Sequence, residues 1–373
     1  MNDNFDVVVV GAGIVGLSAA LAAAQKGKRV AVIERSARAI GASIRNFGFV
    51  TVTGQKAGDH WARAMRSREI WARVAHEAGI VITHHGLIMP AYRPEAAAVV
   101  HAFLKTEMGA ACKLMTRDEA AKHVPALKLD SAREILYSPH EVRVESVDAI
   151  PKITAWLAER HGVTFHWNTA VHAVDGYRVE TSRGTFRGDA IVVCPGDDLA
   201  TLFPARIAQY EVQICTLQML RLDPGQTKLG AAVMSDLSLA RYEGFNDLPE
   251  ARALAMRLDE DMRESREAGI HLIVVQSADG SLVVGDSHVY GEAQAPFAQI
   301  RIDDLMLEEF DRVFDLPGRK IVQRWVGSYA SSRERTVVVD APADHVRLVM
   351  VTGGTGASTG FALGEQVIDD LYA

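Results

Sequence analysis

Residues 6–34 read DVVVVGAGIVGLSAALAAAQKGKRVAVIE, and this stretch decides the fold of the chain. The β-branched run Val7–Val10 suits a strand that is buried on both faces. The run is followed by a G-x-G-x-x-G pattern made by Gly11, Gly13 and Gly16. In this pattern the first glycine permits a tight turn, the second lets backbone approach a pyrophosphate, and the third lets the helix pack closely on the strand. The pattern predicts a strand, a phosphate-binding turn and a helix.

The same stretch contains both parts of a dinucleotide site. Ile14 and Val15 begin the expected helix, where free N–H groups and the helix dipole favour a phosphate. Val30–Ile33 is a second buried strand, and Glu34 ends it. An acidic residue about 20 residues past the glycines accepts both ribose hydroxyls. Because a carboxylate repels a 2′-phosphate, the sequence predicts a dinucleotide that lacks one.

Length and composition indicate a globular protein. The chain has 373 residues, which is enough for two lobes and a sizeable core. Hydrophobic residues make up 48% and charged residues 23%, as in ordinary globular proteins. The formal net charge of −7 gives no support to binding of nucleic acid or of an anionic membrane surface. We therefore expect no nucleic-acid partner.

Cysteine usage and the N-terminal region favour a cytoplasmic protein. Three cysteines are scattered without a C-x-x-C spacing: Cys112, Cys194 and Cys215. This distribution predicts reduced thiols and no metal site. The uncharged run from Val7 to Ala24 has the hydropathy of a signal peptide or membrane helix, but it contains the phosphate-turn glycines and follows Asp6 rather than a basic residue. We expect no membrane span.

A second glycine-rich segment lies near the C-terminus. The strand expected at 346–351 runs into TGGTGASTGF at 352–361. The glycines let backbone approach a flat ligand, and a helix beginning near Gly360 would direct its N–H groups at the carbonyl edge of a flavin. A glycine-rich loop before a packing helix is the alternative. Two nucleotide-type elements at opposite chain ends suit one long cofactor, FAD, and the residues assigned to it here are Gly353, Gly354, Thr355, Gly356, Ser358 and Thr359.

Strands of the nucleotide-binding type occur at the start, in the middle and at the end of the chain, and antiparallel-looking strands occupy the gaps. The predicted fold is α/β, or α+β overall. It has a Rossmann-like FAD-binding domain, similar to the glutathione-reductase type, interrupted by a substrate domain with a mixed or antiparallel sheet. The expected cofactor domain comprises residues 1–82, 142–208 and 316–373, and the substrate domain comprises residues 83–141 and 209–315.

Four features resemble one known superfamily: the opening βαβ unit, the loop Gly41–Gly48 of form GASxxNxG, the segment Trp325–Gly327 and the terminal glycine helix. Nearly the whole chain is similar to the FAD-dependent D-amino-acid oxidase, glycine oxidase and sarcosine oxidase superfamily. The resemblance implies hydride transfer from the carbon bearing the amine to flavin N5, followed by imine hydrolysis. It adds to the expected cofactor contacts Arg35, Ser43, Arg45, Asn46, Phe47, Gly48, Val171, Gly196, Trp325 and Gly327.

The flavin is expected to be bound non-covalently, because no cysteine lies in the C-terminal lobe and no histidine adjoins the Arg45 loop. More narrowly, the chain resembles a bacterial branch found with organophosphonate catabolism, whose members are linked to oxidation of 2-aminoethylphosphonate-type amines. This resemblance implies that 2-aminoethylphosphonate or its N-methyl derivative is oxidised to phosphonoacetaldehyde. The stretches that carry it are 45–48, 194–198, 238–245 and 285–291.

The expected substrate anchor departs from the superfamily pattern. Amino-acid oxidases of this superfamily commonly carry an arginine shortly after the Trp-x-Gly element, but Tyr329 occupies that position here. A tyrosine hydroxyl gives one neutral hydrogen bond in place of two charge-assisted ones, which favours a different anion. A phosphonate needs cationic and hydroxyl donors, although each candidate also has a purely structural interpretation. The candidates are Arg45, Arg241, Tyr242, His288, Arg324, Tyr329 and, after this loop, Arg333.

Two other functions remain open on the sequence alone. The first is a glycine, sarcosine or D-amino-acid oxidase or dehydrogenase whose substrate carboxylate is held by another arginine. The second is a nucleotide-binding module without redox chemistry. Some flavin amine oxidases carry a lysine that is thought to promote reaction with oxygen, and Val283 stands at that position here. The electron acceptor is therefore open: it is molecular oxygen or another molecule. The sequence identifies neither a catalytic base nor an oligomeric state.

Overall fold

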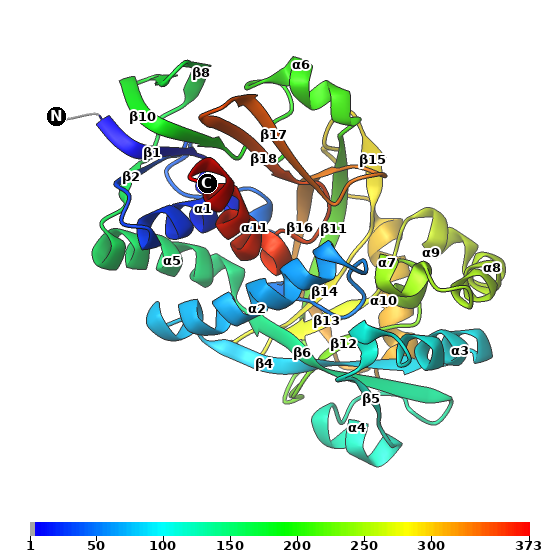
Figure 1. Cartoon of the computed structure of the whole chain (residues 1–373). Helices are drawn as coiled ribbons and strands as arrows, with labels where there is room; N and C mark the ends of the chain where they lie inside the picture. The colour runs from blue at the N-terminus through cyan, green and yellow to red at the C-terminus, as the bar shows by residue number, and fades with distance from the viewer. Residues whose placement is uncertain (1–3) are drawn as a thin grey trace.

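The computed structural model describes residues 4–373 and contains two β-sheets (Figure 1). Residues 1–3 of the expected cofactor domain lie outside the described residues. In the first sheet the strand order is β17-β18-β10-β1-β2-β7, with β9 beside β10 and β8 beside β9. The strands are β1 (Asn4–Val10), β2 (Val30–Ile33), β7 (Thr164–His166), β8 (Val171–Asp175), β9 (Arg178–Thr181), β10 (Gly184–Val193), β17 (Val337–Ala343) and β18 (Val346–Val351).

Strand β1 lies at the centre of the first sheet and pairs in parallel with β10 and β2. Its residues Val7, Val8 and Val9 are fully buried. Val7 and Val9 belong to the core cluster on one face of the sheet, and Val8 belongs to the cluster on the other. Full burial of one such side chain contributes about 1.5–3 kcal/mol. The expected strand with two buried faces is therefore present.

Long helices from distant parts of the chain pack near this sheet (Figure 1). Helices α1 and α11 approach each other closely, since a Cβ on Gly364 would lie 2.5 Å from the carbonyl carbon of Ser18. Helix α5 ends at Gly162, which adopts a left-handed conformation. The helices of this part are α1 (Ile14–Gln25), α2 (Asp59–Glu77), α5 (Ser146–His161), α6 (Pro204–Ile207) and α11 (Gly356–Leu371), with 3-10 turns η1 (Ala42–Ile44) and η3 (Ala208–Tyr210).

The second sheet has the order β15-β11-β14-β13-β12-β4-β6-β3, with β16 beside β11 and β5 beside β6. Its strands are β3 (Phe49–Val50), β4 (Ile82–Ala91), β5 (Lys113–Leu114), β6 (Glu134–Val144), β11 (Gln213–Asp223), β12 (Ala232–Met234), β13 (Ile273–Gln276), β14 (Leu282–Gly285), β15 (Val289–Gly291) and β16 (Lys320–Ser331). The mixed α/β architecture of the two sheets confirms the predicted fold class.

Short helices connect the strands of the second sheet. The segment 249–268 contains two helices that meet at Met262, where φ is −138°. The elements are α3 (Pro94–Phe103), η2 (Glu107–Gly109), α4 (Arg117–His123), η4 (Ser238–Ala240), α7 (Glu243–Asn246), α8 (Ala251–Asp261), α9 (Arg263–Glu267) and α10 (Ile300–Val313).

Strand β16 connects the two parts of the chain. It pairs antiparallel with β11 along its length, from Ser331 opposite Gln213 to Lys320 opposite Asp223. Residues 320–331, which the sequence assigns to the cofactor domain, are thus strand residues of the second sheet. The division into two domains stays a prediction. Because of this pairing, Tyr329 on β16 lies opposite Cys215 on β11.

Among residues 4–373, no helix combines the length and the apolar character needed to cross a bilayer. The uncharged N-terminal run divides between strand β1 and helix α1, which is 12 residues long. Its hydropathy therefore reflects burial against the sheet.

Candidate functional site

A cavity of about 790 Å³ is lined by residues of both sheets. The opening glycine turn, the loop 39–47 and the turn 352–357 supply lining residues from the first part of the fold. Arg241, Tyr242 and His288 line the same cavity from the second part. The structure thus brings the expected cofactor elements and several expected substrate residues to one continuous space.

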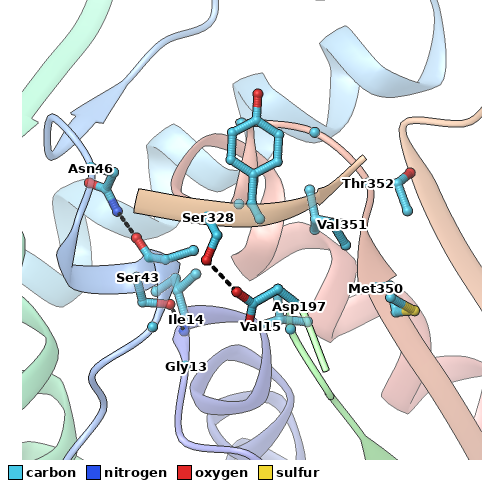
Figure 2. A pocket seen from close by; sticks show the side chains of 18 of the residues that line it. Gly13, Ile14, Val15, Ser43, Asn46, Asp197, Ser328, Met350, Val351 and Thr352 are labelled. Carbon is cyan, nitrogen blue, oxygen red and sulfur yellow. Dashed lines mark hydrogen bonds between the residues drawn. The ribbon is translucent and has the colours of Figure 1, made fainter. Parts of the chain in front are cut away.

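The opening turn leaves no space for side chains. Gly11 has φ of +101°, and a Cβ there would lie 2.5 Å from the carbonyl oxygen of Cys194. A Cβ on Gly16 would lie 1.9 Å from the carbonyl oxygen of Gly11. The hydroxyl of Ser43 accepts a hydrogen bond of 2.9 Å from the N–H of Ile14, so the loop after β2 is fixed to the N-terminus of α1 (Figure 2).

Glu34 is held in place at the end of β2. One carboxylate oxygen accepts the N–H of Ala12 at 3.0 Å, and the other accepts the N–H of Ser36 at 2.9 Å. Each carboxylate oxygen has a second lone pair, which suits a ribose hydroxyl. The neighbouring Arg35 also lines the cavity, where it pairs with Asp198 at 2.8 Å.

The loop 41–48 is folded by its own side chains and by β16. Asn46 donates to the carbonyl of Ala42 at 2.8 Å and accepts the N–H of Gly48 at 2.6 Å. The indole N–H of Trp325 donates to the carbonyl of Arg45 at 3.0 Å. Gly48 and Trp325 do not line the cavity, whereas Ser43, Arg45, Asn46, Phe47, Val171, Gly196 and Gly327 do. Gly48 and Trp325 therefore help to shape the loop without lining the cavity.

Figure 2 shows a further polar contact of the cavity that the sequence did not identify: the hydroxyl of Ser328 donates to the carboxylate of Asp197. Both residues line the cavity. Asp197 follows β10 and Ser328 belongs to β16, so this hydrogen bond joins the two sheets at the cavity wall. A carboxylate and a serine far apart in sequence give no motif that could have indicated it.

The second glycine turn is shorter than expected. Helix α11 begins at Gly356 and not near Gly360, because β18 ends at Val351 and the turn needs few residues before the backbone becomes helical. Ser358 and Thr359 consequently lie inside the helix and outside the cavity lining. The Ser358 hydroxyl accepts the N–H of Thr51 at 3.0 Å, and the Thr359 hydroxyl donates to the Thr355 carbonyl at 2.9 Å.

The turn itself offers space and a polar group to a ligand. A Cβ added to Gly353 would meet nothing within 4 Å. The Thr355 hydroxyl is buried and has no hydrogen-bond partner among residues 4–373. An open glycine beside an unpaired hydroxyl, both lining the cavity with Gly354 and Gly356, fits a flat polar ligand at this turn.

Six of the seven residues considered for substrate binding line the cavity: Arg45, Arg241, Tyr242, His288, Tyr329 and Arg333. Arg324 does not. Its guanidinium pairs with Asp303 at 2.7 Å, and its side chain is 55% exposed. Neighbouring side chains of a strand point to opposite faces, so Arg324 is turned away from the face on which Trp325 contacts the cofactor loop. The exposed Arg333 lies at the cavity wall as well.

Tyr329 contacts both parts of the cavity. Its hydroxyl lies 3.7 Å from the position that a Cβ would take on Gly354, and its ring centre lies 6.4 Å from that of His288. Burial raises the pKa of Tyr329 well above its ordinary value, so the phenol is neutral. Arg241 donates a hydrogen bond of 3.0 Å to the hydroxyl of Tyr290. The second part of the cavity therefore presents one guanidinium surrounded by phenols.

A histidine and carboxylate cluster lies beside Arg241. His271 Nε2 is 3.2 Å from one oxygen of Asp286, and His288 Nε2 is 3.7 Å from the other. Burial lowers the pKa of both histidines well below the ordinary value and raises that of Asp286 to about 7. The sequence interpretation missed His271, Asp286 and Tyr290. The stretch 285–291 was used only for its resemblance to the aminophosphonate branch, and no role was assigned to Asp286 or Tyr290. His271 belongs to no recognisable motif.

The comparisons identify the family. Residues 6–369 match the family described as "FAD dependent oxidoreductase". The chain belongs to this family. A glycine oxidase from Geobacillus kaustophilus (strain HTA426) is 25% identical over 210 residues, which are 52% of this chain and 55% of that protein. A monomeric sarcosine oxidase from Bacillus sp. (strain B-0618) is 23% identical over 209 residues, 52% of each chain. The chain therefore spans about half the length of these relatives.

Solved structures confirm the fold over the whole chain. An L-proline dehydrogenase from P. horikoshii superimposes with a TM-score of 0.80 at 18% identity, covering 99% of this chain and 93% of the other. A glycine oxidase from Geobacillus kaustophilus gives a TM-score of 0.79 at 18% identity, covering 99% and 95%. FAD is accordingly the cofactor of this member of the family, and the fixed Glu34, the open Gly353 and the unpaired Thr355 fit it.

We expect Glu34→Gln to weaken FAD binding about tenfold to hundredfold. A glutamine has one acceptor oxygen, so it cannot serve the N–H groups of Ala12 and Ser36 and a ribose together, and hydrogen bonds to a charged acceptor contribute about 1.5–3 kcal/mol. Titration of the apoprotein with FAD, followed by quenching of flavin fluorescence, gives the dissociation constant. Glu69→Gln, at an exposed pair on α2, is the control. Equal affinity in both variants would contradict the role of Glu34.

Proposed function

We propose that this protein is an FAD-dependent oxidoreductase that oxidises the carbon bearing the amine of an aminophosphonate. The substrate is 2-aminoethylphosphonate or its N-methyl derivative, and hydrolysis of the imine gives phosphonoacetaldehyde. Bound FAD supplies the acceptor for the hydride. The residues of the chain bind the anion, direct the reacting carbon toward the flavin part of the cavity and keep the amine in the reactive form.

The observation that carries the proposal is the position of Arg241. It is a cationic side chain in the cavity that also contains the family's glycine turns, and it donates to Tyr290 while Tyr242 and Tyr329 line the same space. A guanidinium binds tetrahedral oxyanions through parallel hydrogen bonds, and phenol hydroxyls add neutral donors. A phosphonate has three oxygens for such donors, whereas a carboxylate has two.

Tyr329 supports the same substrate class. It stands where amino-acid oxidases of this superfamily commonly carry the arginine that binds the substrate carboxylate. Since the phenol of Tyr329 is buried and neutral, it cannot replace that charge. The anion is then bound by Arg241, which lies on the segment between η4 and α7, and not by a residue of β16.

A second candidate is oxidation of glycine, sarcosine or a D-amino acid. The names of the two matched relatives, a glycine oxidase and a sarcosine oxidase, favour it. In this case Arg241 would bind the carboxylate. The two candidates share the cofactor and the cavity and differ in the anion that the guanidinium receives.

A substrate panel separates the candidates. The purified protein should be yellow, and under anaerobic conditions 2-aminoethylphosphonate or its N-methyl derivative should bleach the flavin faster than glycine, sarcosine or D-alanine. Oxygen uptake recorded alongside identifies the electron acceptor. Bleaching by the amino acids alone would refute the aminophosphonate proposal. A colourless protein that does not bind added FAD would refute both candidates.

A further inference from the structure

Asp286 and His288 form a buried pair in the cavity wall, and the hydrogen-bonding requirements of this pair are not met by the protein. Each residue is only 6% exposed. His288 Nδ1 lies 2.9 Å from the carbonyl oxygen of Gly269, and because a carbonyl only accepts, this nitrogen carries the hydrogen. In the neutral imidazole, Nε2 is then an acceptor. It faces a carboxylate oxygen of Asp286 at 3.7 Å.

Two acceptors that face each other need a donor between them. The other oxygen of Asp286 is also unsatisfied: it lies 3.2 Å from His271 Nε2, without hydrogen-bond geometry, and has no hydrogen-bond partner among residues 4–373. A buried carboxylate with an unpaired oxygen is uncommon in folded proteins, and at a ligand cavity it indicates a missing donor. The protonated nitrogen of an amine substrate is a donor of this kind.

The surroundings keep the pair able to accept a proton near neutral pH. Burial raises the pKa of Asp286 to about 7, although the nearby charge of Arg241 acts in the opposite direction. Burial lowers the pKa of His288, and Arg241 lowers it further, so the imidazole is neutral. The other titratable groups around the pair are His271, Cys215, Tyr242, Tyr290 and Tyr329.

We propose that Asp286 and His288 are the proton acceptor for the substrate ammonium. An N–H bond of the ammonium breaks, the proton bonds to the facing oxygen of Asp286, where His288 Nε2 shares it, and the electron pair of the broken bond stays on nitrogen. That lone pair then forms the C=N bond as the hydride leaves the neighbouring carbon. The inference rests on the proposed function as an amine oxidoreductase and holds for either candidate substrate.

The same side chains raise the question of a metal ion, because ligand atoms of His271, Asp286 and His288 lie within 4.8 Å of one another. The sequence predicts no metal site. The guanidinium of Arg241 stands in the same cavity, and its charge acts on all three groups. A divalent cation would add two positive charges beside that guanidinium, whereas an ammonium adds one, which the carboxylate of Asp286 neutralises when it takes the proton. The geometry therefore favours proton transfer.

The test is the pH dependence of flavin reduction in the Asp286→Asn holoenzyme. With the amine that bleaches the wild type, the ratio of reduction rate constant to Kd should rise through pH 7 in the wild type, as Asp286 loses its proton, and then stay level. The variant accepts only the neutral amine. At pH 7 the ratio of reduction rate constant to Kd should be about 10²- to 10³-fold lower in the variant than in the wild type. It should rise tenfold per pH unit toward the ordinary amine pKa of about 10.

Two variants and one binding measurement serve as controls. Asp303→Asn removes a buried carboxylate that pairs with Arg324 outside the cavity, and its pH profile should match the wild type. His288→Gln keeps the carboxylate of Asp286. Its rate defect should be smaller than that of Asp286→Asn, and its pH profile should have the shape of the wild-type profile. Methylphosphonate, followed by its effect on the flavin spectrum, should bind Asp286→Asn as tightly as the wild type or more tightly, since a carboxylate near the anion is gone.

A defect of equal size at every pH, or none at pH 7, would overturn the inference. So would one equivalent of a bound metal ion, with loss of flavin reduction on treatment of the holoenzyme with EDTA. If the wild type is reduced by glycine and not by the aminophosphonate, only the substrate assignment falls, and the pH test proceeds with glycine. If no amine reduces the wild type, the proposed function and this inference fall together.

Discussion

Arg241→Ala should lower kcat/KM for the anionic amine by about 10²- to 10³-fold, because truncation of one partner of a buried charged contact costs about 2–5 kcal/mol. The guanidinium lines the cavity, and its hydrogen bond of 3.0 Å to Tyr290 is made with a phenol and not with a carboxylate. It is therefore available to an anion. Steady-state oxygen uptake, or anaerobic bleaching if oxygen is not the acceptor, gives the ratio.

The loss should appear mainly in KM, since the anion is bound equally in the ground state and the transition state. Arg257→Ala, at an exposed arginine on α8 that pairs with Asp261, is the matched control and should keep the wild-type ratio. Methylphosphonate should lose affinity for Arg241→Ala in parallel with the substrate. An unchanged kcat/KM in Arg241→Ala would remove this residue from the anion site and with it the main support for the aminophosphonate proposal.

Gly16→Ala should lower the free energy of unfolding by about 3 kcal/mol or more and should yield protein without FAD. The added Cβ would lie 1.9 Å from the carbonyl oxygen of Gly11 and 3.2 Å from Val9. The carbonyl oxygen belongs to the turn between β1 and α1, so the helix must move away from the strand. That movement displaces the N-terminus of α1, where the sequence predicts that the phosphates of the cofactor bind.

Urea unfolding followed by circular dichroism, together with the ratio of absorbance at 450 and 280 nm, measures both effects. Gly318→Ala is the matched control, because a Cβ there meets nothing within 4 Å and its φ is not in the left-handed region. This variant should keep its FAD and unfold at the wild-type urea concentration. A stable, FAD-loaded Gly16→Ala protein would show that α1 does not need its close approach to the strand.

Local patterns predicted the elements whose determinants lie within a few residues. The β-branched run forms β1, and the G-x-G-x-x-G turn leads directly into α1. The prediction for α11 was one turn late, because glycine and serine residues carry a weak helix preference and the true start depends on where β18 ends. The break at Met262 between α8 and α9 likewise has no proline or glycine to mark it.

The cluster beside Arg241 is a product of strand register. Ile273 of β13 pairs with Gly285 of β14, and just beyond this pair the backbones of His271 and Asp286 exchange hydrogen bonds. The N–H of Asp286 donates to the carbonyl of His271 at 3.1 Å, and His288 follows two residues later. Arg241 reaches the same place from the segment after η4. No spacing in the sequence connects these residues, because β pairing brings together positions that are distant along the chain.

The sequence by itself determined that this chain builds a dinucleotide turn, with Glu34 at the end of the second strand, because a G-x-G-x-x-G turn is a local structure whose parts follow one another directly. It also indicated FAD through a second glycine segment. Only the tertiary structure decided which of the candidate side chains face the cavity: it placed Arg241 there, turned Arg324 to Asp303, and assembled Asp286 with His288. The physical reason is that side-chain direction and strand register are set by pairing and packing across the whole fold.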